Sequence, residues 1–216
     1  MKSPNDIIYR DMEAGDVRGV CEICDDVWYC GGPDGITDPV LAFVASEQLT
    51  YHYLADSTYS RVAVDSDGVC VGALMANVAG EPLNEYSTRF SELEAECDRK
   101  LLTDERAALM SNFYVEMYRN CDAMKEKHIG EYGSELLLFY VRKGCQGLGI
   151  GKRLLSDYRD HLKSKGIEGT FLFTNNFCNI GFYDHSGWIC IEHLTSMING
   201  QRFDGYLYGK RISSMD

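Results

Sequence analysis

The sequence predicts one domain of the mixed α/β class, with helices on the faces of a single sheet. Its 216 residues are enough for one substantial core. An apolar strand, a helix and a second strand follow one another between residues 134 and 175, and such a crossover implies a parallel pair. Strand runs joined by tight turns stand before and after this unit. We therefore expect a mostly antiparallel sheet with one parallel strand pair.

The first quarter of the chain predicts one short strand and two helices. Residues 6–11 contain the residues of a strand, and Asp16 then precedes an amphipathic pattern as a helix N-cap does. This first helical pattern covers residues 17–30. A glycine-rich loop separates it from a second helical pattern at residues 40–55.

A hairpin and a charged helical insertion follow. Residues 60–80 contain two runs of strand formers around Asp67 and Gly68, a dipeptide that favours a tight turn. Residues 81–132 then predict two amphipathic helices, which we expect to be an insertion without a core of its own. Apolar residues recur at helical spacing in both helices: Phe90, Leu93 and Cys97, then Leu109, Phe113, Met117, Cys121 and Met124.

The last third of the chain supplies the crossover unit and a second hairpin. The continuous apolar run at residues 134–141 is typical of a strand that is buried on both faces. The elements expected after it are a helix that ends at Gly166, a strand at 169–175, a short helix at 179–187 and a hairpin that turns at Asn199 and Gly200.

Charge and hydropathy argue against several classes of protein. A formal net charge of −12 disfavours a nucleic-acid-binding surface, which is normally basic, and agrees with a cationic substrate. No apolar run reaches the ~20 residues of a membrane span. The first 16 residues lack the apolar segment of a signal peptide. We therefore expect a cytoplasmic protein without a nucleic-acid or membrane partner.

The cysteines are expected to be reduced. There are nine of them, an odd number, and no export signal accompanies them. Cys21, Cys24 and Cys30 could suggest a metal site, but no second Cys/His pair with ligand spacing follows. We favour packing of Cys21 and Cys24 on one helix face, and we expect no metal.

A glycine-rich turn between the apolar strand and the next helix is the clearest candidate binding motif. Such a turn presents backbone N–H groups that can bind phosphate. A Walker loop would need glycine in place of Gln146 and serine or threonine in place of Arg153, and a dinucleotide fingerprint would need glycine in place of Lys152. The sequence therefore matches neither the Walker loop nor the dinucleotide fingerprint. The pattern that it does contain at this turn is Gln146-x-x-Gly149-x-Gly151.

This pattern resembles the signature of the GCN5-related N-acetyltransferase (GNAT) superfamily, and a second block, residues 176–188, is similar to the family's later motif. The matching positions of that block are Asn176, Ile180, Phe182, Tyr183, Asp184 and Gly187. Asn179, His185 and Trp188 stand where alanine, lysine and phenylalanine are usual. The resemblance covers nearly the whole chain except residues 81–132. It implies a single acetyltransferase domain over residues 1–216.

The resemblance also implies acetyl-CoA as co-substrate. Its pyrophosphate would meet the glycine turn, and its pantetheine arm would pair with the backbone of Phe139 and Val141. The N–H of Phe139 would polarise the thioester carbonyl. The implied cofactor-binding residues are Phe139, Tyr140, Val141, Gln146, Gly147, Leu148, Gly149, Ile150, Gly151, Lys152, Asn176, Asn179, Phe182 and Tyr183.

Two residues are candidates for proton transfer. Tyr183 occupies the family's tyrosine position, where its phenol would protonate the leaving thiolate, although it could instead stack on the pantetheine arm. Glu135 matches the strand glutamate that acts as base in the histone-acetylating branch. Strand alternation would put its side chain on the same face as Leu137 and Phe139. The alternative for Glu135 is a solvated carboxylate at the start of the strand.

The expected reaction is direct acetyl transfer to the primary amine of a small, cationic molecule. A protein or peptide N-acetyltransferase and a non-catalytic acetyl-CoA-binding regulator are the alternatives. The insertion could be a lid, a homodimer contact or a wall of the acceptor pocket. Its aromatic residues considered for that wall are Tyr86, Phe113, Tyr114 and Tyr118, for most of which core packing is favoured.

Overall fold

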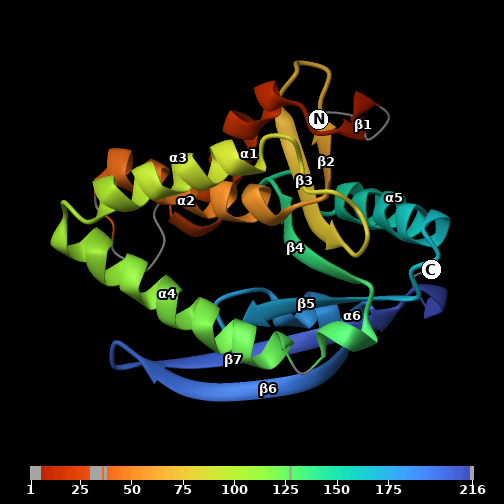
Figure 1. The fold of residues 1–216 in the computed structure, drawn as a ribbon. Helices are drawn as coiled ribbons and strands as arrows, with labels where there is room; N and C mark the ends of the chain where they lie inside the picture. Colours follow the sequence, from red (N-terminus) through yellow and green to blue (C-terminus); the bar gives the residue numbers. More distant parts are fainter. Residues whose placement is uncertain (1–5, 30–35, 37, 127, 215–216) are drawn as a thin grey trace.

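The computed structural model describes residues 6–29, 36, 38–126 and 128–214, and within these ranges the chain forms a seven-stranded sheet (Figure 1). The strand order is β1-β2-β3-β4-β5-β7-β6. Neighbouring strands are antiparallel except β4 and β5, which are parallel, so the predicted sheet is confirmed. The strands are β1 (Ile8–Asp11), β2 (Tyr59–Val64), β3 (Cys70–Val78), β4 (Ser134–Val141), β5 (Gly169–Asn175), β6 (Ile189–Ile198) and β7 (Gln201–Arg211).

Helices cover both faces of the sheet. Figure 1 shows α1, α2 and α3 on one side of β3 and β4, and α5 on the other. Side chains of β2 alternate accordingly, since Val62 and Val64 pack in the core beneath α1 and α2 while Ala63 packs in the core beneath α5. The helices are α1 (Val17–Cys24), α2 (Pro39–Asp56), α3 (Ser87–Leu101), α4 (Glu105–Lys125), α5 (Ile150–Ser164) and α6 (Ile180–His185).

The N-terminal helix differs from the prediction in its capping. Asp16 precedes α1, but its carboxylate accepts hydrogen bonds from Arg10 at 2.6 and 2.8 Å and from the Glu13 N–H instead of capping the helix. Cys21 and Cys24 are buried on α1, as expected. Cys30 lies outside the described residues. No cluster of metal-ligating side chains occurs among the residues that the structure describes.

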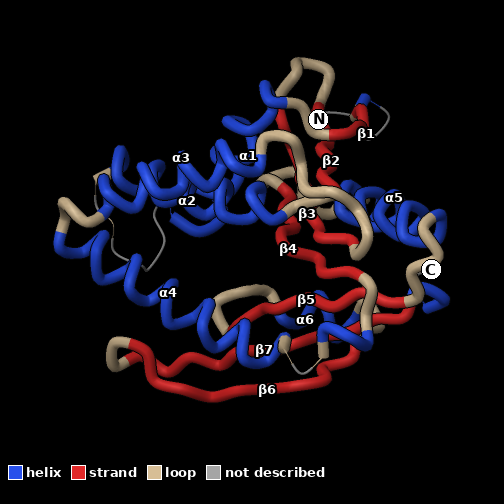
Figure 2. The backbone as a smooth tube through the Cα atoms, in the orientation of Figure 1, coloured by secondary structure: helices blue, strands red, loops and turns tan. Residues whose placement is uncertain are grey.

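The insertion consists of α3 and α4. Helix α3 packs along α2, and α4 crosses from α3 to the β6–β7 hairpin (Figure 2). Met117 packs with Phe203, and Met124 with Leu207, so α4 shares its core with the C-terminal strands. Leu109 lies on the same face of α4 as Phe113 and Met117, as expected, but it is 54% exposed. These shared cores support the proposal that residues 1–216 form one domain.

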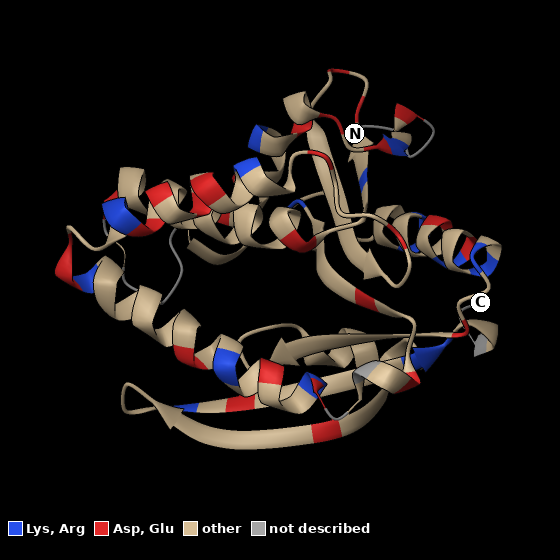
Figure 3. Cartoon of the chain, viewed as in Figure 1, with Lys and Arg blue, Asp and Glu red and all other residues tan. Residues whose placement is uncertain are grey.

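Charged residues of both signs occur along α3, α4 and α5 (Figure 3). None of the helices in the described ranges has the length and hydrophobicity of a transmembrane span.

Candidate functional site

Strands β4 and β5 meet at one end and then separate. Their parallel register is limited to Glu135 opposite Phe171. The β3–β4 register shifts beside Met75, which leaves Leu137 without a partner on β3. Such a bulge bends a strand and increases its twist. Beyond it, β4 continues along β3 while β5 continues along β7, so a wedge opens between them (Figure 2).

Because of this bulge, the side chains of β4 do not all lie on the faces of the sheet that were predicted for them. Leu137 and Leu138 both contact the core beneath α1 and α2, whereas Phe139 packs against the core beneath α5. The prediction that Glu135, Leu137 and Phe139 share one face is therefore wrong at Phe139. The strand is buried on both faces, as predicted: Leu136 lies in the core beneath α5, and Leu138 and Tyr140 lie in the core beneath α1 and α2, with half-buried side chains between them.

Among the described residues, no strand pairs with the edge of β4 that faces the wedge beyond Glu135. The Arg142 N–H donates to the Val71 carbonyl at 3.0 Å, which fixes the direction of the ladder between β3 and β4. Since hydrogen-bonding directions alternate along a strand, the N–H and C=O groups of Phe139 and Val141 point away from β3, toward the wedge. The backbone groups of Phe139 and Val141 are thus oriented so that an extended ligand in the wedge could pair with them.

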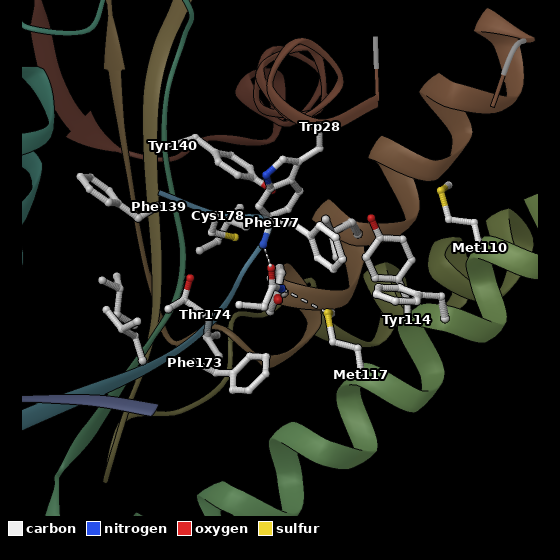
Figure 4. A pocket seen from close by; sticks show the side chains of 18 of the residues that line it. Trp28, Met110, Tyr114, Met117, Phe139, Tyr140, Phe173, Thr174, Phe177 and Cys178 are labelled. Carbon is white, nitrogen blue, oxygen red and sulfur yellow. Dashed lines mark hydrogen bonds between the residues drawn. The ribbon is translucent and has the colours of Figure 1, made fainter. Parts of the chain in front are cut away.

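A cavity of about 460 Å³ occupies the wedge and extends beneath the insertion (Figure 4). One face of α4 forms its outer wall, with residues at helical spacing: Arg106, Leu109, Met110, Phe113, Tyr114 and Met117. The inner wall comes from β4 and β5, and Trp28 and Tyr53 close one side. Among the described lining residues there is no carboxylate, and Arg106 is the one with a charged side chain.

Two of the four aromatic residues considered for the wall of the acceptor pocket line this cavity. Phe113 and Tyr114 do so. Tyr118 instead stacks on His52, with ring centroids 4.4 Å apart, and Tyr86 is exposed. Hence the insertion provides a wall of the pocket.

Tyr183 reaches the cavity from α6. Its ring packs edge-on against Trp188 at 5.9 Å and beside Tyr208 at 5.6 Å. Burial raises the pKa of the Tyr183 phenol, so it keeps its proton at neutral pH. Two side chains of β7 hold α6 in place: the Tyr208 hydroxyl donates to Asp184 at 2.7 Å, and the Lys210 ammonium donates to the Ser186 carbonyl at 2.6 Å.

Glu135 does not belong to the cavity lining. It lies where β4 and β5 meet, and its carboxylate forms an ion pair with Lys125 of α4. Both side chains are largely buried, with 15% and 19% of their surface exposed. Burial raises the pKa of Glu135, and the Lys125 ammonium opposes this rise. The structure thus brings Glu135 to the insertion and not to Tyr183.

The glycine turn has three residues in the left-handed region of backbone conformation. Gly144, Gly147 and Gly149 all have positive φ angles, of 83°, 81° and 80°. Gly149 is the N-cap of α5 and offers no side chain, so the first N–H groups of the helix have no side-chain acceptor. Gly151 serves packing, because a Cβ there would lie 2.9 Å from the Phe139 ring. Lys152 is exposed beside this turn.

The remaining predicted residues of the later motif lie around α6. Asn176 braces β5 on β7, since its side-chain carbonyl accepts from the Asp204 N–H at 2.9 Å. Asn179 is exposed at the start of α6. The Phe182 ring lies 5.9 Å from that of Phe139.

The other predicted contacts on and after β4 differ in their surroundings. Tyr140 points its hydroxyl toward Cys24 of α1, with a donor–acceptor distance of 3.4 Å. Ile150 is the first residue of α5 and its side chain is buried, so only its backbone is available to a ligand. Gln146 and Leu148 lie on the turn, exposed and half-buried respectively.

Sequence reasoning missed several residues of the cavity. Trp28, Met110 and Phe177 come from segments far apart in the chain, and no local motif marks them. Arg106, Asn199 and Gln201 line the same cavity because α4 lies beside the β6–β7 hairpin, to which the Asn199 amide joins it by donating to the Leu109 carbonyl. The helical spacing in α4 was the one available signal, and it indicates core contact as readily as a pocket.

Comparisons with known proteins agree on the fold. A family model described as "Acetyltransferase (GNAT) family" matches residues 36–188, more than two thirds of the chain. A comparison with curated protein sequences gives no match. A solved polyamine N-acetyltransferase from Drosophila melanogaster has 15% identity and a TM-score of 0.59, over 95% of this chain and 100% of its own. An arylalkylamine N-acetyltransferase from Aedes aegypti has 14% identity and a TM-score of 0.57, over 96% and 100%.

Proposed function

The chain belongs to the acetyltransferase (GNAT) family of acyltransferases, and we propose that it transfers an acetyl group from acetyl-CoA directly to the primary amine of a small molecule with an apolar body. The observation that carries this proposal is the largely apolar cavity that begins at Tyr183 in the wedge and ends beneath α4. Membership of the family gives the enzyme class and the co-substrate. The acceptor is our inference from the lining of the cavity.

The residues of the wedge and of the glycine turn fit acetyl-CoA. The free backbone edge at Phe139 and Val141 matches an extended arm that adds as a strand. The uncapped start of α5, from Gly149 to Lys152, suits the pyrophosphate, because helix N-termini attract anions. When bound, acetyl-CoA supplies the thioester carbon that the amine attacks and the thiolate that leaves.

The protein groups then have separate tasks. The N–H of Phe139 would donate to the thioester oxygen as negative charge develops there. Tyr183, which burial keeps protonated, would give its phenolic proton to the leaving thiolate, and the phenolate would then take up the proton that the nitrogen loses as the amide forms. The aromatic walls exclude water from both groups.

The amine must reach the site without its extra proton. An alkylammonium has a pKa of about 10.4 in water. An apolar cavity disfavours the charged form, because burial removes its hydration, and the described lining offers no carboxylate to compensate. We propose that this desolvation, and not Glu135, favours the neutral amine.

The chemistry of the cavity favours an aromatic or aliphatic amine over a polyamine. Two solved structures of similar fold are named for polyamine and arylalkylamine acetylation. Trp28, Phe113, Tyr114 and Phe177 suit an aromatic ring. The wall formed by α4 favours a small molecule over a protein substrate, and Tyr183 in the cavity favours an enzyme over a non-catalytic sensor.

A thiol-release assay with acetyl-CoA tests the proposal. Tryptamine and 2-phenylethylamine should stimulate release more strongly than spermidine or agmatine, and product masses should show one added acetyl group. Release that no amine stimulates would favour the sensor. A preference for spermidine would contradict the apolar acceptor while leaving the acetyltransferase intact.

A further inference from the structure

The outer end of the cavity has a chemistry unlike the rest of its lining. Arg106 stands there, in the first turn of α4. No described residue forms an ion pair or hydrogen bond with its guanidinium. The adjacent Asp104 carboxylate is committed to the helix, because it accepts the N–H groups of Arg106 at 3.0 Å and Ala107 at 2.9 Å. An unpaired arginine therefore faces a cavity whose described lining has no acid.

Two amide side chains accompany this arginine. Asn199 belongs to the turn between β6 and β7, Gln201 is the first residue of β7, and both line this cavity. The Asn199 side-chain amide donates to the Leu109 carbonyl at 3.1 Å, which joins the turn to α4 beside Arg106. Gln201 keeps an exposed amide with N–H groups that can donate to an anion.

We infer that the acceptor carries an anionic group, such as a carboxylate, at the end away from its amine, and that Arg106 binds this group. The inference rests on the proposed function and adds the charge of the substrate to it. A guanidinium presents paired N–H donors that match the two oxygens of a carboxylate. The acceptor class is then an amine, an apolar or aromatic body and a distal carboxylate. A second ammonium in that place would be repelled.

The test compares acceptors that differ only at the distal group. These are 2-phenylethylamine, 4-(2-aminoethyl)benzoate and 4-(2-aminoethyl)benzamide, each measured for kcat/KM with saturating acetyl-CoA. The benzamide matches the benzoate in shape and lacks its charge. We expect the enzyme to prefer the benzoate over the benzamide on the order of tenfold, as for a charge-assisted hydrogen bond that is partly open to water.

Variants assign this preference to one side chain. Arg106→Gln should reduce the benzoate-to-benzamide ratio to about one, and Arg106→Glu should invert it. Arg119→Gln is the matched control, since Arg119 is exposed on the same helix, pairs with Glu116 at 2.6 Å and lies outside the cavity lining. Arg119→Gln changes the net charge by the same amount as Arg106→Gln, and this control variant should keep the benzoate-to-benzamide preference of the unmodified enzyme.

The outcomes separate this inference from the proposed function. If 2-phenylethylamine is acetylated but the benzoate has no advantage, or keeps its advantage in Arg106→Gln, the anionic acceptor is wrong and the acetyltransferase stands. If none of the three amines is acetylated while acetyl-CoA binds, the proposed function fails and the inference fails with it.

Discussion

The ion pair between Lys125 and Glu135 offers a quantitative test of how the insertion is fixed to the sheet. It joins the last residue of α4 to the point where β4 and β5 meet. Removing one partner of a buried pair leaves an uncompensated charge and typically costs about 3–5 kcal/mol. Since both side chains are largely buried here, Lys125→Met should lower the free energy of unfolding by about that amount.

Urea denaturation of three variants measures this effect. Lys125→Met and Glu135→Leu should each be strongly destabilised, whereas the double variant should recover most of the loss, because two apolar side chains need no partner. Lys163→Met is the control: Lys163 is exposed on α5, and its replacement should change stability by no more than about 0.5 kcal/mol. A single variant that loses under about 1 kcal/mol, or a double variant that loses the sum of both, would refute the reasoning.

The pH dependence of Lys125→Met follows from the sign of the pKa shift. Burial raises the pKa of Glu135, and the variant removes the cation that opposes the rise. A carboxyl group with a raised pKa in the folded state is tolerated in its protonated form and destabilises the fold once it must ionise. The unfolding free energy of the variant should therefore decrease, relative to the unmodified protein, as pH rises from acidic to neutral.

Four further predictions concern the proposed site. Tyr183→Phe should lower kcat by about 10²-fold with little change in the KM for acetyl-CoA, and a change in KM alone would contradict the acid role. The raised pKa of Tyr183 should keep the alkaline limb of the kcat profile above the ordinary phenol range, and Tyr183→Phe should remove that limb. Gly149→Ala places a side chain at φ 80°, so calorimetry should show weaker acetyl-CoA binding and a stability loss of about 1–2 kcal/mol. Tyr208→Phe removes the bond to Asp184, and kcat should fall while acetyl-CoA affinity, measured by the same titration, is kept.

The parts of the fold that depend on local chemistry could be predicted from the sequence. Asn199 and Gly200 turn a hairpin because both adopt positive φ, and Gly166 ends α5 for the same reason. The bulge at Leu137 could not be predicted, because Leu136, Leu137 and Leu138 are identical side chains and any of them could be the extra residue. The error about the face of Phe139 followed from it.

In the candidate site, too, residues in local motifs could be predicted from the sequence, whereas contacts between distant segments could not. The glycine turn and Tyr183 lie in contiguous motifs, so their roles could be proposed from the sequence. The assignment of Glu135 as base used its offset alone, and that offset contains no information about Lys125, which comes from another helix. Arg106 and Gln201 line one cavity only because α4 lies beside the β6–β7 hairpin.

The straight wall formed by α4 relates position in the sequence to depth in the cavity. From Met117 to Arg106 the helix advances eleven residues, or about 16 Å at 1.5 Å per residue. Each turn of this helix would therefore border a different segment of an acceptor bound as proposed. Enlarging Met110 would shorten the longest acceptable chain, whereas a change at Met117 would act nearest the wedge. Deleting one helical turn between them would select a shorter substrate without altering the catalytic end.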